Sequence, residues 1–396
     1  MRINKIFFEI DPVKTVRISL HQKYKSTYFK QCTKCVMDNS INNLRFDKNG
    51  ICEYCNKYEI IIDEKKIFNK KSNIKNKINN LKKSKKKYDA ILGVSGGVDS
   101  SFLTLKCKEW GLNILLVHFD NGWNSNESIR NIKAIQEFTK YDLYTHVVDW
   151  EEFKKLQLSF LKANLVNFES PSDHGIFSLL YNVANEKKIS NILTGINFET
   201  ETFVEFEEDE KTFAFGYSYG DLYHLKSVYK KFYKDPLTTF PQLSYFKKAY
   251  FQKIKKIKMI NILDYTNYKK SSAIEYLEKL TNWKRYPSKH FESIITRFHQ
   301  SFILPVKFGL DKRTLHLSNL IWSKQISRSE ALIELKKDIC DESLLVQDYY
   351  FFLKKLNLYE SDFRKICLTD EKFFFQYPNS HKFFKILKKI KKIFNG

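Results

Sequence analysis

The sequence predicts an α/β protein with a doubly wound parallel sheet. Short apolar runs, typical of buried strands, alternate with longer segments whose apolar residues recur at helical spacing. This alternation favours parallel strands with helices on both faces of the sheet. The strands are expected at residues 89–94, 113–119, 143–148 and 191–194, and the helices between them at residues 101–110, 128–140 and 176–187.

Other segments surround this domain, which we place at residues 88–235. Residues 1–30 are expected to be a strand-rich lead-in, residues 31–60 a zinc-ribbon-like module, and residues 61–87 a basic helical linker. Residues 236–396 are mainly helical in pattern and are expected to bind a substrate or a partner.

Three helices are expected in the C-terminal region. One covers residues 271–280, and a second begins at the capping box formed by Ser327 and Glu330. The third, at residues 383–394, carries apolar residues largely on one side and lysines opposite. Such a helix either packs on its own domain, which we favour, or lies on a membrane surface.

Composition limits the classes of protein. The chain has 396 residues, of which 43% are hydrophobic, so it can build a core. Its formal charge of +23 suits an anionic ligand or surface, but it also fits a compositional bias toward lysine along the chain. No apolar run is long enough for a transmembrane helix, and the N-terminus lacks the apolar core of a signal peptide. We therefore expect a cytoplasmic protein.

The chemistry is predicted at a glycine-containing loop between the first strand and the first helix. Residues 95–100 read SGGVDS. Gly96 and Gly97 let the backbone turn sharply and approach an anion, and the free N–H groups of the following helix point at the same place. Asp99 fits such a site if a cation such as Mg²⁺ also binds there. The alternative is a plain turn in which Ser95 and Asp99 cap the helix.

An SGGVDS loop after a buried strand resembles the signature of the PP-loop ATP pyrophosphatases, which include GMP synthetase, NAD synthetase and several tRNA-modifying enzymes. Within that class the chain is most similar to the N-acetyl sugar amidotransferases of the O-antigen and pseudaminic-acid type. Collinear segments that carry this resemblance are residues 118–125, 142–144, 147–153, 171–174, 194–197, 289–293, 296–298, 309–313 and 316–318. The likeness covers most of residues 31–335. The strongly acidic stretch 198–215, the lead-in and the basic tail depart from it.

The resemblance implies an activity. ATP would adenylate the carbonyl oxygen of an N-acetyl group on a nucleotide-activated sugar, with release of pyrophosphate. Ammonia would then displace AMP to give an acetamidino sugar for a surface polysaccharide or a flagellin glycan. We find no Cys/His nucleophilic constellation in the chain, so a separate glutamine amidotransferase is expected to supply the ammonia. ATP and Mg²⁺ are the implied ligands.

Roles for individual residues follow from the resemblance and from the rule that ligands bind outside the carboxyl ends of parallel strands. The residues expected to be catalytic are Ser95, Asp99, Ser100, Asp173 and His174. Those expected to bind ATP are Ser95, Gly96, Gly97, Val98, Asp99, Ser100, Ser101, His118, Asp120, Asn121, Gly195 and Asn197. Those expected to bind the acceptor are Lys289, His290, Arg297 and Arg313. The alternatives are ordinary capping for the Asp and Asn residues, a structural role for His174, and a solvated helix face for the cations.

Two cysteine pairs predict a structural metal site. Cys32 and Cys35 form one CxxC pair, and Cys52 and Cys55 form another, separated by 16 residues. This spacing is typical of zinc ribbons, in which four thiolates complete a closed tetrahedron. Redox and iron–sulfur roles are the alternatives, and we favour structural Zn²⁺.

Two rival functions remain open. A tRNA-modifying PP-loop enzyme, of the thiolase or lysidine synthetase type, would use the positive charge on a phosphate backbone. No further CxxC pair follows the loop to support thiolation, so we do not expect a nucleic-acid partner. A zinc-ribbon scaffold that binds nucleotide without turnover is the second rival.

Overall fold

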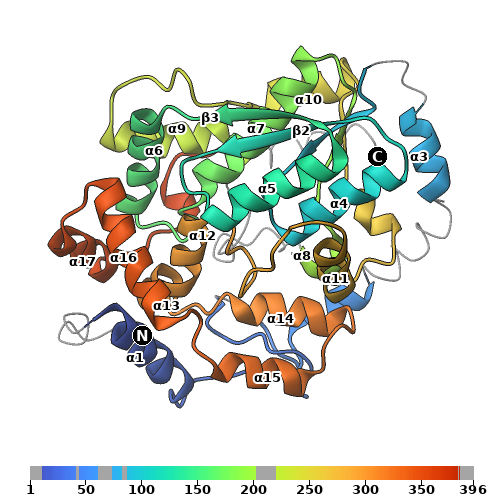
Figure 1. Ribbon diagram of the computed structural model, residues 1–396. Helices are drawn as coiled ribbons and strands as arrows, with labels where there is room; N and C mark the ends of the chain where they lie inside the picture. Colours follow the sequence, from blue (N-terminus) through green and yellow to red (C-terminus); the bar gives the residue numbers. More distant parts are fainter. Residues whose placement is uncertain are drawn as a thin grey trace, which may run out of the picture.

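A computed structural model describes residues 11–41, 44–60, 74–82, 87–201, 220–381 and 383. Within them, five parallel strands form one sheet in the order β3-β2-β1-β4-β5 (Figure 1). The strands are β1 (Ala90–Gly93), β2 (Ile114–Asp120), β3 (Asp142–Val147), β4 (Asn191–Leu193) and β5 (Lys258–Ile260). The predicted doubly wound α/β class is confirmed.

Helices cover both faces of the sheet. Ala90 and Leu92 of β1 belong to a core shared with α4, α5 and α11, whereas Ile91, between them, belongs to a second core shared with α6 and α7. Successive side chains of a strand point to opposite faces, so β1 is buried on both sides. The described helices are α1 (Pro12–Tyr24), α3 (Ile74–Lys82), α4 (Val98–Glu109), α5 (Asn126–Thr139), α6 (Trp150–Lys162), α7 (Ser170–Glu186), α8 (Phe198–Glu201), α9 (Leu222–Phe232), α10 (Tyr245–Lys253), α11 (Lys270–Leu280), α12 (Ile294–Phe298), α13 (Leu304–Phe308), α14 (Arg313–Trp322), α15 (Arg328–Lys336), α16 (Glu342–Leu356) and α17 (Glu360–Leu368).

The expectation of a strand-rich lead-in at residues 1–30 is wrong for the part that the structure describes, which begins at residue 11. Residues 12–24 form helix α1, which begins at Pro12 after Asp11, whose side chain accepts a hydrogen bond from the Lys14 N–H at 2.8 Å. This helix packs on α13 and α16, and the Ser19 hydroxyl donates to the Pro305 carbonyl at 2.6 Å. Tertiary packing overrides the weak local preference.

Other elements differ from expectation in extent. Helix α7 begins at Ser170 and not at residue 176, because Pro171 suits the first turn of a helix. The sheet gains β5, which lies beyond residue 235, where we placed the end of the domain. The capping box at Ser327 and Glu330 is present and opens α15.

Three predicted segments fall largely outside the described residues. The amphipathic helix expected at residues 383–394 does so except for residue 383, and the acidic stretch 198–215 does so from residue 202 onward. Of the basic linker expected at residues 61–87, the structure describes residues 74–82, which form α3, and residue 87. In the part of the chain that is described, none of the helices combines the length and apolar character needed to cross a bilayer.

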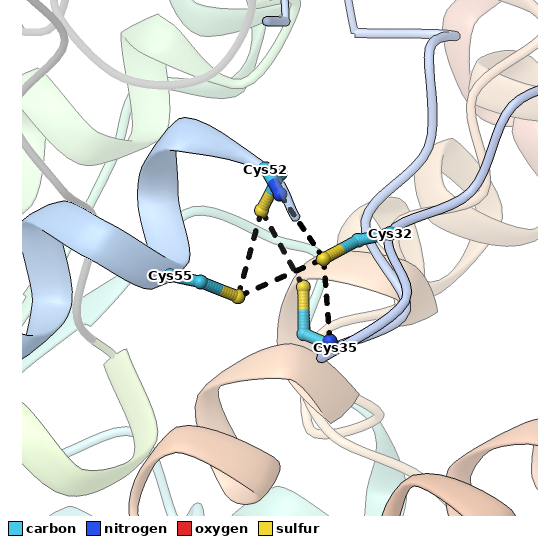
Figure 2. Close-up of side chains that lie close together, drawn as sticks. All are labelled: Cys32, Cys35, Cys52 and Cys55. Carbon is cyan, nitrogen blue, oxygen red and sulfur yellow. Dashed lines mark hydrogen bonds between the residues drawn. The ribbon is translucent and has the colours of Figure 1, made fainter. Parts of the chain in front are cut away.

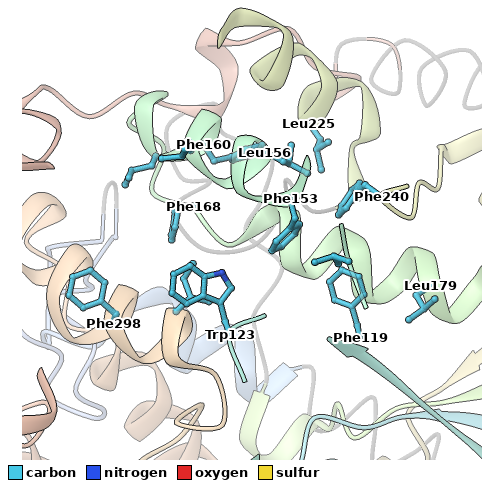
Figure 3. Close-up of a cluster of buried hydrophobic side chains, with 14 of the residues drawn as sticks. Phe119, Trp123, Phe153, Leu156, Phe160, Phe168, Leu179, Leu225, Phe240 and Phe298 are labelled. Atoms are coloured by element: carbon cyan, nitrogen blue, oxygen red, sulfur yellow. The ribbon is translucent and has the colours of Figure 1, made fainter. Parts of the chain in front are cut away.

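An aromatic core joins the sheet to the C-terminal helices. Trp123, which follows β2, is fully buried and donates its indole N–H to the Gln157 side chain at 2.8 Å (Figure 3). Phe298 of α12 and Phe352 of α16 pack with ring centroids 4.7 Å apart, and Phe352 also contacts Trp123. This packing holds the C-terminal helices against the edge of the sheet where β2 ends.

Candidate active site

The predicted loop lies between β1 and α4, at the carboxyl edge of the sheet. Gly96 has a φ of +78°, and a Cβ on it would lie 2.6 Å from the backbone oxygen of Ser128. Gly97 is the N-cap of α4 and provides no capping side chain. The first turn of α4 therefore begins without a capping side chain, which suits the binding of phosphate oxygens.

Residues of the C-terminal region hold this loop in place by hydrogen bonds. The carbonyl oxygen of Gly96 accepts hydrogen bonds from the indole N–H of Trp283 at 2.9 Å and from the Tyr286 hydroxyl at 3.0 Å. The Asn131 side chain holds the Trp283–Tyr286 segment in turn, because its amide donates to the Tyr286 oxygen and accepts from the Lys284 N–H. No motif marked these residues, because their partners lie far away in the chain.

The serines and the aspartate of the loop differ in their hydrogen bonds. The Ser95 N–H donates to the Ser100 hydroxyl at 3.4 Å, and Asp99 accepts a hydrogen bond from the Tyr268 hydroxyl. Ser101 is fully buried, and its hydroxyl has no hydrogen-bond partner among the described residues. An uncapped helix end with hydroxyl donors and a neighbouring carboxylate matches the donor set that a magnesium-bound triphosphate requires.

Residues at the end of β2 and directly after it, His118 to Asn124, lie beside the loop. His118 is buried: its Nδ1 lies 2.9 Å from the Val94 carbonyl oxygen, and its Nε2 lies 3.1 Å from the side-chain nitrogen of Asn124. Burial lowers the pKa of His118, which keeps the ring neutral. Asp120 accepts from the Gly122 N–H and from Asn124, at 2.9 and 3.0 Å. His118 is therefore committed to the fold, whereas Asp120 remains partly exposed at the site.

The start of α7 meets residues 118–124, but His174 does not reach the site. Asn121 donates to the Ser172 hydroxyl at 3.2 Å, which ties the end of β2 to α7. His174 is 2% exposed and accepts the Leu243 N–H through Nε2 at 3.3 Å. We therefore do not retain His174 as a catalytic residue, because its side chain is buried and its Nε2 is bonded to the Leu243 N–H in the interior of the protein. Asp173, next to it, is exposed in the first turn of α7.

Gly195 and Asn197 follow β4 on the other side of the loop. A Cβ on Gly195 would lie 2.7 Å from the backbone nitrogen of Ser100, so the end of β4 passes directly against the first turn of α4. The Asn197 side chain accepts from the Thr200 N–H at 3.0 Å and donates to the Gly195 carbonyl at 3.1 Å. Asn197 thus caps α8, and Gly195 borders the loop at residues 95–100.

Two of the four predicted acceptor cations belong to the fold. Arg297 makes a two-bond ion pair with Asp348, at 2.6 and 2.7 Å, in a buried setting. Arg313 pairs with buried Asp311 at 2.7 Å and also donates to carbonyls at the end of α15. We do not retain either arginine as an acceptor ligand, because a buried guanidinium that lost its carboxylate would leave an unpaired charge.

The other two cations lie near the loop, together with a carboxylate that we did not predict. Lys289 donates to the Thr200 carbonyl at 2.8 Å, and His290 Nδ1 lies 3.8 Å from Glu292 Oε1. A Cβ on Gly97 would lie 2.9 Å from the same Glu292 oxygen. Burial opposes ionisation of Glu292, but His290 and Lys270 outweigh it and lower the pKa of the carboxyl. Glu292 lies within residues 289–293, one of the segments that carry the resemblance. That was the signal in the sequence that could have marked Glu292 as a site residue.

The four predicted cysteines come together in one buried cluster (Figure 2). The Sγ atoms of Cys32 and Cys55 are 3.7 Å apart, those of Cys35 and Cys52 are 3.6 Å apart, and those of Cys52 and Cys55 are 3.7 Å apart. Tetrahedral Zn²⁺ with bonds of about 2.3 Å places thiolates about 3.8 Å apart. The cluster therefore fits a closed zinc site.

Neighbouring groups support this cluster from the C-terminal region. The indole N–H of Trp322 donates to Cys55 Sγ at 3.2 Å, and Arg328 donates to the carbonyls of Cys32 and Cys35 at 2.9 and 3.0 Å. Such contacts around the ligands orient a metal site. The cluster thereby fastens the N-terminal module to α14 and α15.

Comparison with known proteins gives one family match. Residues 292–391 match the family described as LPS biosynthesis protein WbpG-like, C-terminal domain. No curated protein matches the chain.

Three solved structures show weak likeness. One is a predicted subunit of tRNA methyltransferase from Methanocaldococcus jannaschii, 15% identical over 48% of this chain and 75% of that chain, with a TM-score of 0.28. The NMN synthetase of Francisella tularensis is 14% identical over 57% of this chain and 99% of that chain, with a TM-score of 0.27. The NH3-dependent NAD synthetase of Campylobacter jejuni is 15% identical over 71% of this chain and 97% of that chain, with a TM-score of 0.28. At these values the likenesses carry no functional argument.

The family match begins at Glu292 and covers α12 to α17. This family match agrees with the resemblance of the sequence to enzymes of surface-polysaccharide synthesis. We therefore identify residues 292–391 as a region similar to the C-terminal domain of WbpG-like LPS biosynthesis proteins.

Proposed function

We propose that the protein is an ATP-dependent amidotransferase that converts the N-acetyl group of a nucleotide-activated sugar into an acetamidino group. The observation that carries the proposal is the loop at Gly96 and Gly97, which opens α4 without a capping side chain. The family match at residues 292–391 supports a role in lipopolysaccharide synthesis. The resemblance of the loop and of the segments around it supports adenylation as the means of activation.

The proposed reaction has two steps. The amide carbonyl oxygen attacks the α-phosphorus of ATP, the bond to the β-phosphate oxygen breaks, and pyrophosphate leaves. Ammonia then adds to the activated carbon, the C–O bond breaks, and AMP leaves with the former amide oxygen. An amide resists direct attack because its nitrogen donates electrons into the carbonyl, and adenylation turns the oxygen into a good leaving group.

The protein groups at the loop would serve the first step. The N–H groups at the start of α4 would stabilise the charge that develops on the departing pyrophosphate. Asp99, held by Tyr268, would bind the Mg²⁺ that neutralises the phosphates. Gly195 lets the end of β4 pass directly against the first turn of α4, which would fix the position of those N–H groups.

The ammonia is proposed to come from a separate glutamine amidotransferase. Four of the seven cysteines form the metal cluster, and Cys107, Cys340 and Cys367 are buried. Burial raises the pKa of Cys340 and of Cys367 to about 12, which disfavours the thiolate that a glutaminase needs. No cysteine of the chain is therefore suited to release ammonia from glutamine.

The test is to analyse products after incubation of the purified protein with ATP, Mg²⁺, ammonium chloride and a panel of UDP- and CMP-activated N-acetyl sugars. Release of AMP should require both sugar and ammonium, pyrophosphate should form only when sugar is present, and the sugar should lose an oxygen and gain an NH group. The +23 charge also suits tRNA, so tRNA is included as an alternative acceptor. ADP formation, or AMP formation that depends on tRNA, would reject the proposal.

A further inference from the structure

Helix α10 presents a row of large apolar side chains at the surface of the protein (Figure 1). Phe246, Tyr250 and Ile254 recur at four-residue spacing, so they lie on one side of the helix. They are 74%, 46% and 66% exposed. Phe383, which is also exposed, extends the row, because its ring centroid lies 6.3 Å from that of Phe246. We call these four residues the apolar strip.

Other residues of α10 hold the helix on the rest of the protein. Phe251 is buried and stacks on Tyr181 of α7 with ring centroids 6.4 Å apart. The Gln252 side chain donates to the Tyr181 hydroxyl at 2.9 Å. Single exposed apolar side chains are ordinary, but a contiguous row of them marks a surface that contacts a partner. The apolar strip is therefore available for such a contact.

The surroundings of the apolar strip are basic. The chain has six lysines and no aspartate or glutamate from residue 236 to residue 263. Four of these lysines are exposed and form no ion pair with a described residue, namely Lys247, Lys253, Lys255 and Lys256. A lysine beside apolar residues can lay its methylene stem along them and keep its ammonium group in water or at charged headgroups. The strip is thus flanked by positive charge that no ion pair offsets.

This combination of side chains indicates the kind of partner. Aromatic and aliphatic side chains between lysines suit the boundary of a lipid bilayer, where apolar groups enter the headgroup region and lysines meet anionic phosphates. A nucleic acid would use the lysines and could stack bases on Phe246 or Tyr250, but Ile254 offers no ring for stacking. The sequence after Phe383 has five lysines and no acidic residue, so like charges disfavour it as the segment that covers α10.

We propose that the apolar strip and the lysines beside it form a peripheral binding site for an anionic phospholipid surface. The four apolar side chains enter the headgroup region, and the lysines contact the lipid phosphates. No residue of α10 belongs to the candidate active site described above. The membrane site is therefore independent of the proposed amidotransferase reaction.

Flotation with lipid vesicles tests this site directly. The full-length protein would be mixed with unilamellar vesicles of phosphatidylcholine alone, or of an equimolar mixture of phosphatidylcholine and phosphatidylglycerol. The double variant Phe246→Gln/Ile254→Gln removes apolar area and keeps the charge. The double variant Lys253→Gln/Lys256→Gln removes charge and keeps the apolar strip. All four side chains are exposed, so both variants should fold and melt as the wild type does.

Matched controls make the same changes elsewhere on the surface. Ile333→Gln/Tyr359→Gln removes one exposed isoleucine and one exposed aromatic side chain, at α15 and at the start of α17. Lys279→Gln/Lys336→Gln removes two exposed lysines, from α11 and α15. These controls separate an effect of the α10 surface from a general effect of hydrophobicity or charge.

The wild type should float with the anionic vesicles and not with phosphatidylcholine alone, and added salt should weaken its binding. Each α10 variant should bind the anionic vesicles about tenfold more weakly, and both controls should bind as the wild type does. A wild type that does not bind anionic vesicles would overturn the site. So would α10 variants that bind them as tightly as the wild type.

Two further measurements would reveal a different occupant. If both α10 variants weaken filter binding to tRNA and the wild type does not bind vesicles, the surface binds nucleic acid and the proposal is wrong. If Phe246→Gln/Ile254→Gln lowers the melting temperature and the wild type does not bind vesicles, a segment of this chain covers the apolar strip. That outcome would also reject the membrane site.

Discussion

The indole N–H of Trp283 donates to the carbonyl oxygen of Gly96 at 2.9 Å, across 187 residues of sequence. This bond ties the turn of the phosphate loop to the segment that precedes α12. Tyr286 shares the same acceptor. The loop is therefore held in its conformation by the C-terminal region as well as by β1 and α4.

Removing the shared hydrogen bond should loosen the loop. We expect Tyr286→Phe to lower the free energy of unfolding by about 1–2 kcal/mol, since it removes the hydroxyl that donates to Gly96 and accepts from Asn131 while the ring still packs. The KM for ATP should rise several-fold, because the loop is less ordered before binding. Urea unfolding and steady-state kinetics would measure both. A loss of stability with an unchanged KM for ATP would mean that the bond supports the fold alone.

Gly96→Ala should abolish nucleotide binding. The new Cβ would meet the backbone oxygen of Ser128 at 2.6 Å, so the loop must move, and the positive φ adds strain. Gly309→Ala is the matched control, because Gly309 has a φ of +63° but no atom lies within 4 Å of the place that a Cβ would take. That control should cost about 1–2 kcal/mol of stability and keep ATP binding. Equal loss of ATP binding in both variants would contradict the close packing of the loop.

The cysteine cluster should contain zinc and stabilise the fold. We expect elemental analysis to find about one zinc ion per chain, and Cys52→Ser to lose it, because a closed site needs four thiolates. Chelation should lower the melting temperature and change the fluorescence of Trp322, whose indole N–H donates to Cys55. Iron with visible absorbance, or a chain without metal that keeps its full stability, would refute a structural zinc site.

The Asp311–Arg313 pair should govern part of the acid stability. Burial opposes ionisation of Asp311, but Arg313 and Lys23 outweigh it and lower the pKa of this carboxyl. A carboxyl with a lowered pKa in the folded state stabilises the protein above its unfolded pKa of about 3.9, and this stabilisation is lost as the pH falls through the folded pKa. Asp311→Asn should therefore cost about 3–5 kcal/mol at pH 7, because it leaves Arg313 buried and unpaired.

Denaturant unfolding at pH 7 and between pH 5 and 2 would measure this effect. The difference between wild type and Asp311→Asn should shrink toward the acid end. Because Arg313 pairs with Asp311 inside the protein, we expect Asp311→Asn to leave the KM for the sugar unchanged as long as the variant is folded. A raised KM in a fully stable variant would restore Arg313 as an acceptor ligand.

Features that depend on neighbouring residues could be predicted from the sequence. The four longer strand runs, the SGGVDS loop and the cysteine pairs each carry their signal within a few residues, and the structure contains all of them. Helix α1 was missed because its β-branched residues favour strand locally, whereas packing on α13 decides its state. Strand β5 has three residues, as β4 does, but it begins with an exposed lysine and is not a buried apolar run, so it gave no strand signal.

Roles that depend on distant partners could not be predicted. Arg297 is a candidate ligand by residue type, and only the fold reveals Asp348 beside it, 51 residues away. His174 follows a proline in a segment of the resemblance, yet the helix turns its ring into the interior against Phe240. Glu292 and Trp283 acquire their place at the loop through long-range contacts alone.

The most direct test of the central claim follows one oxygen atom. The acceptor would be a nucleotide-activated sugar labelled with ¹⁸O at its N-acetyl carbonyl, incubated with the protein, ATP, Mg²⁺ and ammonium chloride. The proposed adenylation predicts that the label appears in AMP and is lost from the sugar, which gains an NH group. Label found in inorganic phosphate alongside ADP, or retained in the sugar while AMP forms, would contradict activation of the acetyl oxygen.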